Sequence, residues 1–226
     1  RSNVVRHDLP LMHVDPKVLE RAAAHWGDRL AHRPRPRTAL FVGGRTGGLR
    51  FDREQARDLL QTTLAAVRAS GGSLYVVTSR RTPPEVVEMW RRELPEDVGL
   101  YVYDPRSGPD ENPYHALLAT ADHFVVTTDS LSMMVEVARM GRPLSLYPLE
   151  SEGSPVEHLL EKLGVLRPLA VKSDPLPAGG LRARMMDRLG WPIHTRDLSA
   201  IPRRLVALGL AVWLGDPPPP PRPHAD

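Results

Sequence analysis

Short apolar runs alternate with helical patterns through the middle of this chain, and this alternation constrains its fold more than any other feature. Five runs lack the apolar–polar alternation of a strand with one wet face, and they lie at 39–42, 74–77, 100–103, 124–126 and 144–147. Helical patterns separate them, at 52–69, 84–94, 114–121 and 130–140. Strands that alternate with helices predict parallel βαβ units. We therefore expect an α/β fold with one doubly wound, Rossmann-like parallel sheet.

The remaining segments flank that sheet. We expect a helix at 15–32, a stiff Pro-containing connector at 32–36, and further helices at 155–163, 181–189 and 197–209. The domain prediction is a lead-in segment at 1–37, a Rossmann-like domain at 38–168, a helical C-terminal extension at 169–214 and a Pro-rich disordered tail at 215–226. Because the sequence begins with Arg1, we expect the lead-in segment to come from an N-terminal domain that is missing here.

Composition excludes several classes of function. The chain has 226 residues and no cysteine, so it has no disulfide, zinc–thiolate site or cysteine nucleophile. Its net charge is +3, but no basic run carries interleaved aromatic residues, so nucleic acid is not an expected partner. The apolar stretch at 205–214 is too short to span a bilayer. We expect no transmembrane segment and a cytoplasmic location, with peripheral contact to a membrane left open.

The run at 127–136 joins the fourth apolar run to the helix that follows it. Its small hydroxyl and acidic residues suit a helix N-cap. The first turn of a helix has unpaired N–H groups and a partial positive charge, so it binds phosphates. Asp129, Ser130 and Ser132 are therefore candidates for binding a diphosphate, although capping alone would also explain both serines. Met133 belongs to the same candidate run, and its thioether also suits the core.

Glu136 lies nearly two turns into that helix, among apolar neighbours. A carboxylate in a largely buried helix needs a partner. A ribose hydroxyl beside the bound phosphate is our first hypothesis, and a structural arginine is the alternative. With a ribose as partner, Glu136→Ala should weaken nucleotide binding roughly tenfold to a hundredfold. It should also stabilise the ligand-free protein, because a desolvated carboxylate without a protein partner disappears.

Two further segments follow strands at the same edge of the expected sheet. Gly43 and Gly44 come after the first run, where they either let backbone N–H groups approach a phosphate or form a flexible turn. Ser79, Arg80 and Arg81 come after the second run. A guanidinium there could bind a diphosphate or pair with a helix carboxylate, and we expect only one of the two arginines to face the site.

Asn112 and Tyr114 open the helix at 114–121. Asn112 is a good N-cap and Pro113 suits the first helical position, so local structure is a sufficient explanation. The functional alternative is that this segment borders a nucleobase. The histidines lack the spacing of metal ligands, so we expect no metal site and no cofactor other than a nucleotide sugar bound as substrate or ligand.

Together these segments resemble the mitochondrial fission Elm-type family, which has plant and bacterial members. The resemblance covers roughly residues 1–170. It is carried by residues 79–83, 112–114, 121–136 and 141–143, with 3–5 and the Gly43-Gly44 turn in support.

More distantly, residues 112–143 are similar to the C-terminal half of GT-B glycosyltransferases and nucleotide-sugar epimerases. That resemblance implies that Glu136 contacts the ribose of a nucleotide-diphosphate sugar and that 130–132 hold its diphosphate. The expected function is the donor-binding half of a metal-independent glycosyltransferase. A nucleotide-sugar epimerase and a non-catalytic adaptor of the mitochondrial-fission type are the alternatives. Because the first GT-B domain is not in this sequence, we expect the chain alone not to turn over substrate; no catalytic residue is assigned.

Overall fold

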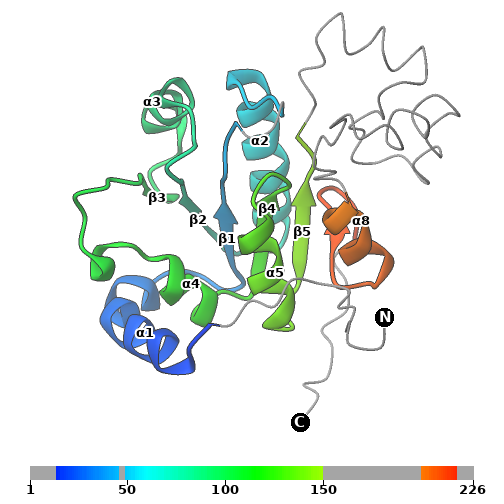
Figure 1. The fold of residues 1–226 in the computed structure, drawn as a ribbon. Coiled ribbons are helices and arrows are strands. Elements are labelled where there is room, and N and C mark those ends of the chain that lie inside the picture. The colour runs from blue at the N-terminus through cyan, green and yellow to red at the C-terminus, as the bar shows by residue number, and fades with distance from the viewer. Residues whose placement is uncertain (1–13, 46–48, 150–199, 218–226) are drawn as a thin grey trace, which may run out of the picture.

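A computed structural model describes residues 14–45, 49–149 and 200–217 (Figure 1). Its centre is a six-stranded sheet in the order β3-β2-β1-β4-β5-β6, and every pair of neighbouring strands is parallel. The strands are β1 (Arg37–Phe41), β2 (Ser73–Val77), β3 (Gly99–Tyr101), β4 (His123–Thr127), β5 (Leu144–Tyr147) and β6 (Val212–Trp213). The first five coincide with the five apolar runs, which confirms the prediction of a doubly wound parallel sheet.

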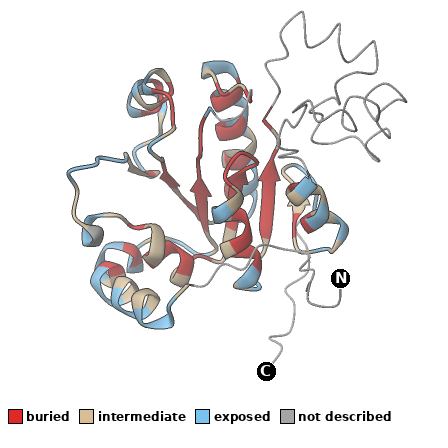
Figure 2. Ribbon diagram, in the orientation of Figure 1, coloured by how far each residue is buried: buried red, intermediate tan, exposed pale blue. Residues whose placement is uncertain are grey.

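Helices cover both faces of the sheet and bury it (Figure 2). They are α1 (Pro16–Ala31), α2 (Arg53–Ala69), α3 (Pro84–Glu93), α4 (Tyr114–Thr120), α5 (Leu131–Arg139) and α8 (Ala200–Ala207), with a short 3-10 turn, η1, at Pro109–Glu111. Alternate residues of β1 point to opposite faces: Phe41 packs with α1, α4, α5 and α8, whereas Leu40 packs with α2 and α3. Within the described ranges, no helix combines the length and the apolarity needed to cross a bilayer.

Local signals in the sequence set where these helices begin and end. Asp52 caps α2, because its carboxylate accepts hydrogen bonds from the N–H groups of Glu54 and Gln55, both at 3.0 Å. Gly141 follows α5 with φ of 65°, a left-handed conformation that glycine adopts without steric cost and that ends the helix. Boundaries therefore agree closely with the periodicity of the sequence.

Both ends of the described chain pack onto the same domain. Trp26 and Leu30 of α1 are buried in one core with α4, and the Trp26 indole N–H donates to the carbonyl of Asp110 at 2.9 Å. The lead-in helix is thus an integral part of the sheet domain.

The described part of the C-terminal extension contains a strand as well as a helix. α8 lies inside the expected helix at 197–209, but the chain then forms β6, whose Val212 and Trp213 pair with Ser145 and Leu146 of β5. Sequence analysis missed β6 because two residues are too few to establish a pattern. The helices expected at 155–163 and 181–189 lie outside the described residues.

Leu205 tests whether α8 belongs to the same cooperative unit as the sheet. Its side chain is fully buried in the core that contains α5. We expect Leu205→Ala to lower the free energy of unfolding by about 2–5 kcal/mol, because it removes buried apolar contacts and leaves a cavity. Denaturant unfolding measures the change. The half-buried Leu208, outside that core, provides the control. If Leu205→Ala and Leu208→Ala lowered the free energy of unfolding by equally small amounts, α8 would unfold separately from the sheet.

Candidate functional site

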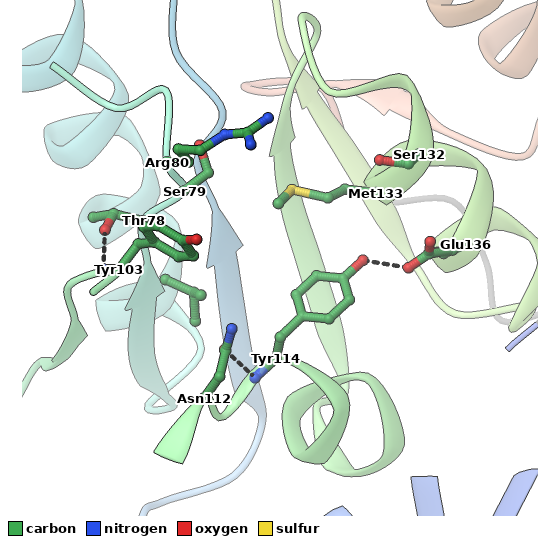
Figure 3. Close-up of a pocket in the computed structure, with 10 residues that line it drawn as sticks. Thr78, Ser79, Arg80, Tyr103, Asn112, Tyr114, Ser132, Met133 and Glu136 are labelled. Atoms are coloured by element: carbon green, nitrogen blue, oxygen red, sulfur yellow. Dashed lines mark hydrogen bonds between the residues drawn. The ribbon is translucent and has the colours of Figure 1, made fainter. Parts of the chain in front are cut away.

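An open pocket of about 260 Å³ lies beyond the carboxyl ends of β2 and β3, facing α4 and α5 (Figure 3). The sheet order reverses between β1 and β4, and the helices that follow these strands, α2 and α5, cover opposite faces. Divergence of helices at such a reversal creates the crevice in which doubly wound proteins bind ligands. The pocket is lined by Val77, Thr78, Ser79, Arg80, Tyr103, Asn112, Tyr114, Ser132, Met133 and Glu136.

Most of the candidates predicted from sequence meet in this pocket. Those that line it are Ser79, Arg80, Asn112, Tyr114, Ser132, Met133 and Glu136, and those that do not are Gly43, Gly44, Arg81, Asp129 and Ser130. Sequence analysis missed Val77, Thr78 and Tyr103. The position of Tyr103 at the end of the third apolar run could have indicated that it borders the site. The strand ends at Tyr101, so Tyr103 lies beyond it and is 37% exposed.

The two adjacent arginines have different surroundings. Arg80 is exposed at the pocket and makes no hydrogen bond or ion pair with another residue in the described part of the chain. Arg81 instead pairs with Asp129, with 3.1 Å between its Nη2 and Oδ2. A free guanidinium at a strand end can take a phosphate, whereas Arg81 already has an anionic partner. Of the two arginines, only Arg80 lines the pocket.

Asp129 is the centre of a buried network that joins three loops. Its side chain is fully inaccessible, and it accepts hydrogen bonds from the N–H of Gly44 at 2.8 Å and from the hydroxyl of Thr127 at 2.7 Å. Thr127 in turn accepts from the N–H of Gly43 at 2.8 Å. Burial raises the pKa of Asp129 above its ordinary value, and the bonds from Thr127, Gly44 and Arg81 oppose that rise. The carboxylate thus occupies the donors that a phosphate would need in this turn.

Close packing explains the two glycines without a ligand. A Cβ on Gly43 would lie 2.1 Å from Oδ2 of Asp129, and one on Gly44 would lie 1.8 Å from the backbone carbonyl oxygen of Arg81. The Gly43 carbonyl also accepts hydrogen bonds from Ser79 at 2.9 Å and Thr82 at 2.6 Å. Tight packing is a third role, beside the phosphate contact and the flexible turn that the sequence left open.

Glu136 has a protein partner, and it is not the arginine considered as the alternative. The Tyr114 hydroxyl donates to Oε2 of Glu136, and the two oxygens are 2.5 Å apart (Figure 3). Burial raises the pKa of Tyr114 well above its ordinary value, and the nearby Glu136 carboxylate raises it further. Tyr114 is therefore a phenol, and a hydrogen-bond donor, at neutral pH. The expectation that Glu136 lacks a protein partner is wrong.

The starts of α4 and α5 differ in how they are capped. The Asn112 side-chain oxygen accepts from the N–H of Tyr114 at 3.0 Å, so the capping role considered for Asn112 is present. Ser130 precedes α5, but its buried side chain makes no capping hydrogen bond. The first turn of α5, which carries Ser132 and Met133 into the pocket, is thus left without a side-chain cap. Its N–H groups lack intrahelical acceptors, as in any α-helix.

Comparison with known proteins decides the relationship. The family described as Mitochondrial fission ELM1 matches residues 1–184. The chain belongs to this family. The match includes every strand and helix from α1 to β5, and with them all the residues that line the pocket.

Two relatives of this family member extend beyond the matched part. The Mitochondrial fission protein ELM1 of Arabidopsis thaliana is 32% identical over 144 residues, which cover 64% of this chain and 33% of the relative. The uncharacterized protein RP120 of Rickettsia prowazekii (strain Madrid E) is 30% identical over 112 residues, which cover 49% and 31%. The chain therefore spans about a third of the length of these curated relatives.

Among solved structures, the chain is similar to that of Medicago truncatula UGT71G1 complexed with UDP-glucose. The match covers 86% of this chain and 40% of the UGT71G1 chain. The identity is 16% and the TM-score is 0.33, a likeness too distant to carry an argument.

In this family member, the segments that carry the resemblance divide by role. The pocket is lined by Ser79, Arg80, Asn112, Tyr114, Ser132, Met133 and Glu136, whereas the buried network is built by Gly43, Gly44, Thr127 and Asp129. Within the described residues, no group of three His, Asp or Glu side chains is arranged to hold a metal ion.

Removal of the Asp129 carboxylate should destabilise the fold. We expect Asp129→Ala to lower the free energy of unfolding by roughly 2–4 kcal/mol, because the Gly44 N–H and the Thr127 hydroxyl each lose a buried acceptor. The control is Arg45→Ala, which breaks the exposed Arg45–Glu85 pair and should cost at most about 1 kcal/mol. Chemical denaturation measures both. If Asp129→Ala were as stable as the control, the network would not hold these loops together.

Substitution of Glu136 should also lower stability, opposite to the expectation from sequence. We expect Glu136→Ala to cost about 1–3 kcal/mol in the ligand-free protein, because the enclosed Tyr114 hydroxyl loses its acceptor. Tyr114→Phe, which removes that hydroxyl and leaves Glu136 at the edge of an open pocket, should cost less. Thermal unfolding of the two variants without nucleotide gives the comparison, and a higher melting temperature for Glu136→Ala would contradict the role of this hydrogen bond.

Proposed function

We propose that the pocket binds a nucleotide-diphosphate sugar and that the chain is the donor-binding half of a metal-independent, GT-B-type glycosyltransferase. The observation that carries the proposal is the pairing of two anion-binding elements across one pocket. Arg80 lies on one side, without a protein partner among the described residues, and the uncapped first turn of α5 lies on the other. A guanidinium and a helix N-terminus both favour phosphate, and a diphosphate is long enough to contact both.

The position of Glu136 supports a nucleotide over a simple phosphate. Glu136 is four residues beyond Ser132, so both side chains lie on the same face of α5 and both line the pocket. A carboxylate repels a phosphate but accepts hydrogen bonds from hydroxyl groups. A ligand with phosphate at the start of α5 and a ribose about one turn further along satisfies both requirements.

The chemistry of transfer would use the same groups. Negative charge develops on the diphosphate as it leaves the sugar, and positioned N–H groups and a guanidinium stabilise such charge. In this proposal Arg80 and the first turn of α5 have that role. A nucleotide-sugar epimerase would bind its substrate in the same way, so identification of products separates the two activities. The chain spans about a third of its curated relatives, and the activity of the whole protein is part of this proposal.

A second candidate is an adaptor of the mitochondrial-fission type that does not catalyse a reaction. Membership of the family described as Mitochondrial fission ELM1 favours it, as does the name of the Arabidopsis relative. An adaptor could keep the sheet, the buried network around Asp129 and the Tyr114–Glu136 hydrogen bond for structural reasons alone. It would not require Arg80 to remain free of a partner, and this difference separates the two candidates.

Calorimetric titration with UDP, ADP, GDP and CDP tests the proposal. We expect one of them to bind, and Arg80→Ala to weaken its affinity roughly tenfold to a hundredfold, as for loss of a hydrogen bond to a charged group. The matched control is Arg68→Ala, an exposed arginine in the last turn of α2 that is not among the residues lining the pocket. Absence of binding by the unmodified chain, or equal losses in both variants, would favour the adaptor.

A further inference from the structure

The hydrogen bond from Tyr114 to Glu136 indicates a role for Tyr114 in the pocket. We propose that Tyr114 is the positioning residue of the pocket: it holds Glu136 so that one carboxylate oxygen, Oε1, is presented to a single ribose hydroxyl and the pocket prefers ribonucleotides to deoxyribonucleotides. The inference rests on the proposed function, since it concerns the same nucleotide-diphosphate site.

The contact between Tyr114 and Glu136 is a short hydrogen bond with Tyr114 as its donor. An O···O distance of 2.5 Å lies in the range of hydrogen bonds from a hydroxyl to an ionised carboxylate. Tyr114 remains the donor because burial disfavours its phenolate. In this hydrogen bond Glu136 is the acceptor, through Oε2.

Only one oxygen of the Glu136 carboxylate has a hydrogen-bond partner among the described residues. Oε2 accepts from Tyr114, while Oε1 accepts no side-chain or backbone hydrogen bond from the residues that the structure describes. Glu136 lines the pocket, so the free acceptor is available to a ligand that offers a hydroxyl. Without the bond from Tyr114, the carboxylate could rotate about its terminal torsion, which is broad in glutamate. Tyr114 thus restricts the acceptor before the ligand arrives, which reduces the entropy lost on binding.

The rigidity of Tyr114 itself makes it suitable for this role. Its ring packs against Phe41, with 4.6 Å between ring centroids, and its backbone N–H is held by the Asn112 cap. Phe41 is fully buried in β1, so the phenol is anchored to the sheet while its hydroxyl reaches α5. The hydrogen bond therefore fixes the side chain of Glu136 relative to the strands that end at the pocket.

A double-mutant cycle read by calorimetry tests this role. The ligands are UDP, ADP, GDP and CDP, each with its 2′-deoxy and 3′-deoxy counterparts. For the ribonucleotide that binds best, we expect Tyr114→Phe to weaken affinity on the order of tenfold and to reduce the preference over one deoxy counterpart. In a Glu136→Gln background the same substitution should change affinity no more than about twofold, because Tyr114 acts through the carboxylate. Tyr101→Phe makes the same chemical change in β3, outside the pocket, and should leave affinity unchanged.

The outcomes separate this inference from the proposed function. Failure of the unmodified chain to bind any of these nucleotides overturns both. Binding with equal affinity in Tyr114→Phe, or an equal loss in the presence and absence of the Glu136 carboxylate, overturns the role of Tyr114 alone. If Tyr114→Phe unfolds below the assay temperature, the cycle is measured at a lower temperature at which the variants are folded, and the same outcomes decide.

Discussion

The buried carboxylate of Asp129 is the interaction on which the arrangement of this site depends. It follows β4, yet it binds the Gly44 N–H after β1 and the Arg81 guanidinium after β2. Asp129 thus contacts two other loops at one point, in addition to the bonds that Gly43 makes with Thr127, Ser79 and Thr82. A buried anion is costly unless it is hydrogen-bonded and paired, so these donors must stay in place for the fold to be stable. The network thereby fixes the strand ends from which the pocket is built.

Arg81 is held by Asp129, and its neighbour Arg80 lines the pocket. Thr82 and Ser79 add to this order, since both hydroxyls donate to the Gly43 carbonyl. The two adjacent arginines therefore differ: Arg81 pairs with Asp129, and Arg80 has no protein partner among the described residues. A similar division exists in α5, where Ser130 is buried beside the network and Ser132 lines the pocket. In both segments, residues that line the pocket lie within a few positions of buried or network residues.

Much of the fold could be predicted because the relevant physics is local. Buried parallel strands read as continuous apolar runs, and the capping of α2 by Asp52 and the stop at Gly141 are visible in a few residues. Two-residue β6 was missed, because its stability comes from pairing with β5 and not from its own sequence. Candidate residues from separate segments were expected at one edge of the sheet because the carboxyl ends of parallel strands meet there, and seven of them line one pocket.

The sequence by itself determined the parallel α/β architecture, the helix limits and the set of polar residues at one edge of the sheet. Only the tertiary structure decided what each of those residues contacts. It separated Arg80 from Arg81, assigned Gly43 and Gly44 to tight packing, and gave Glu136 the Tyr114 hydroxyl as its partner. Periodicity and capping depend on neighbours three or four residues away, whereas a side chain's hydrogen-bond partner can be 22 residues away, as for Tyr114 and Glu136, or 85, as for Gly44 and Asp129. Contacts over such separations exist only once the strands have paired.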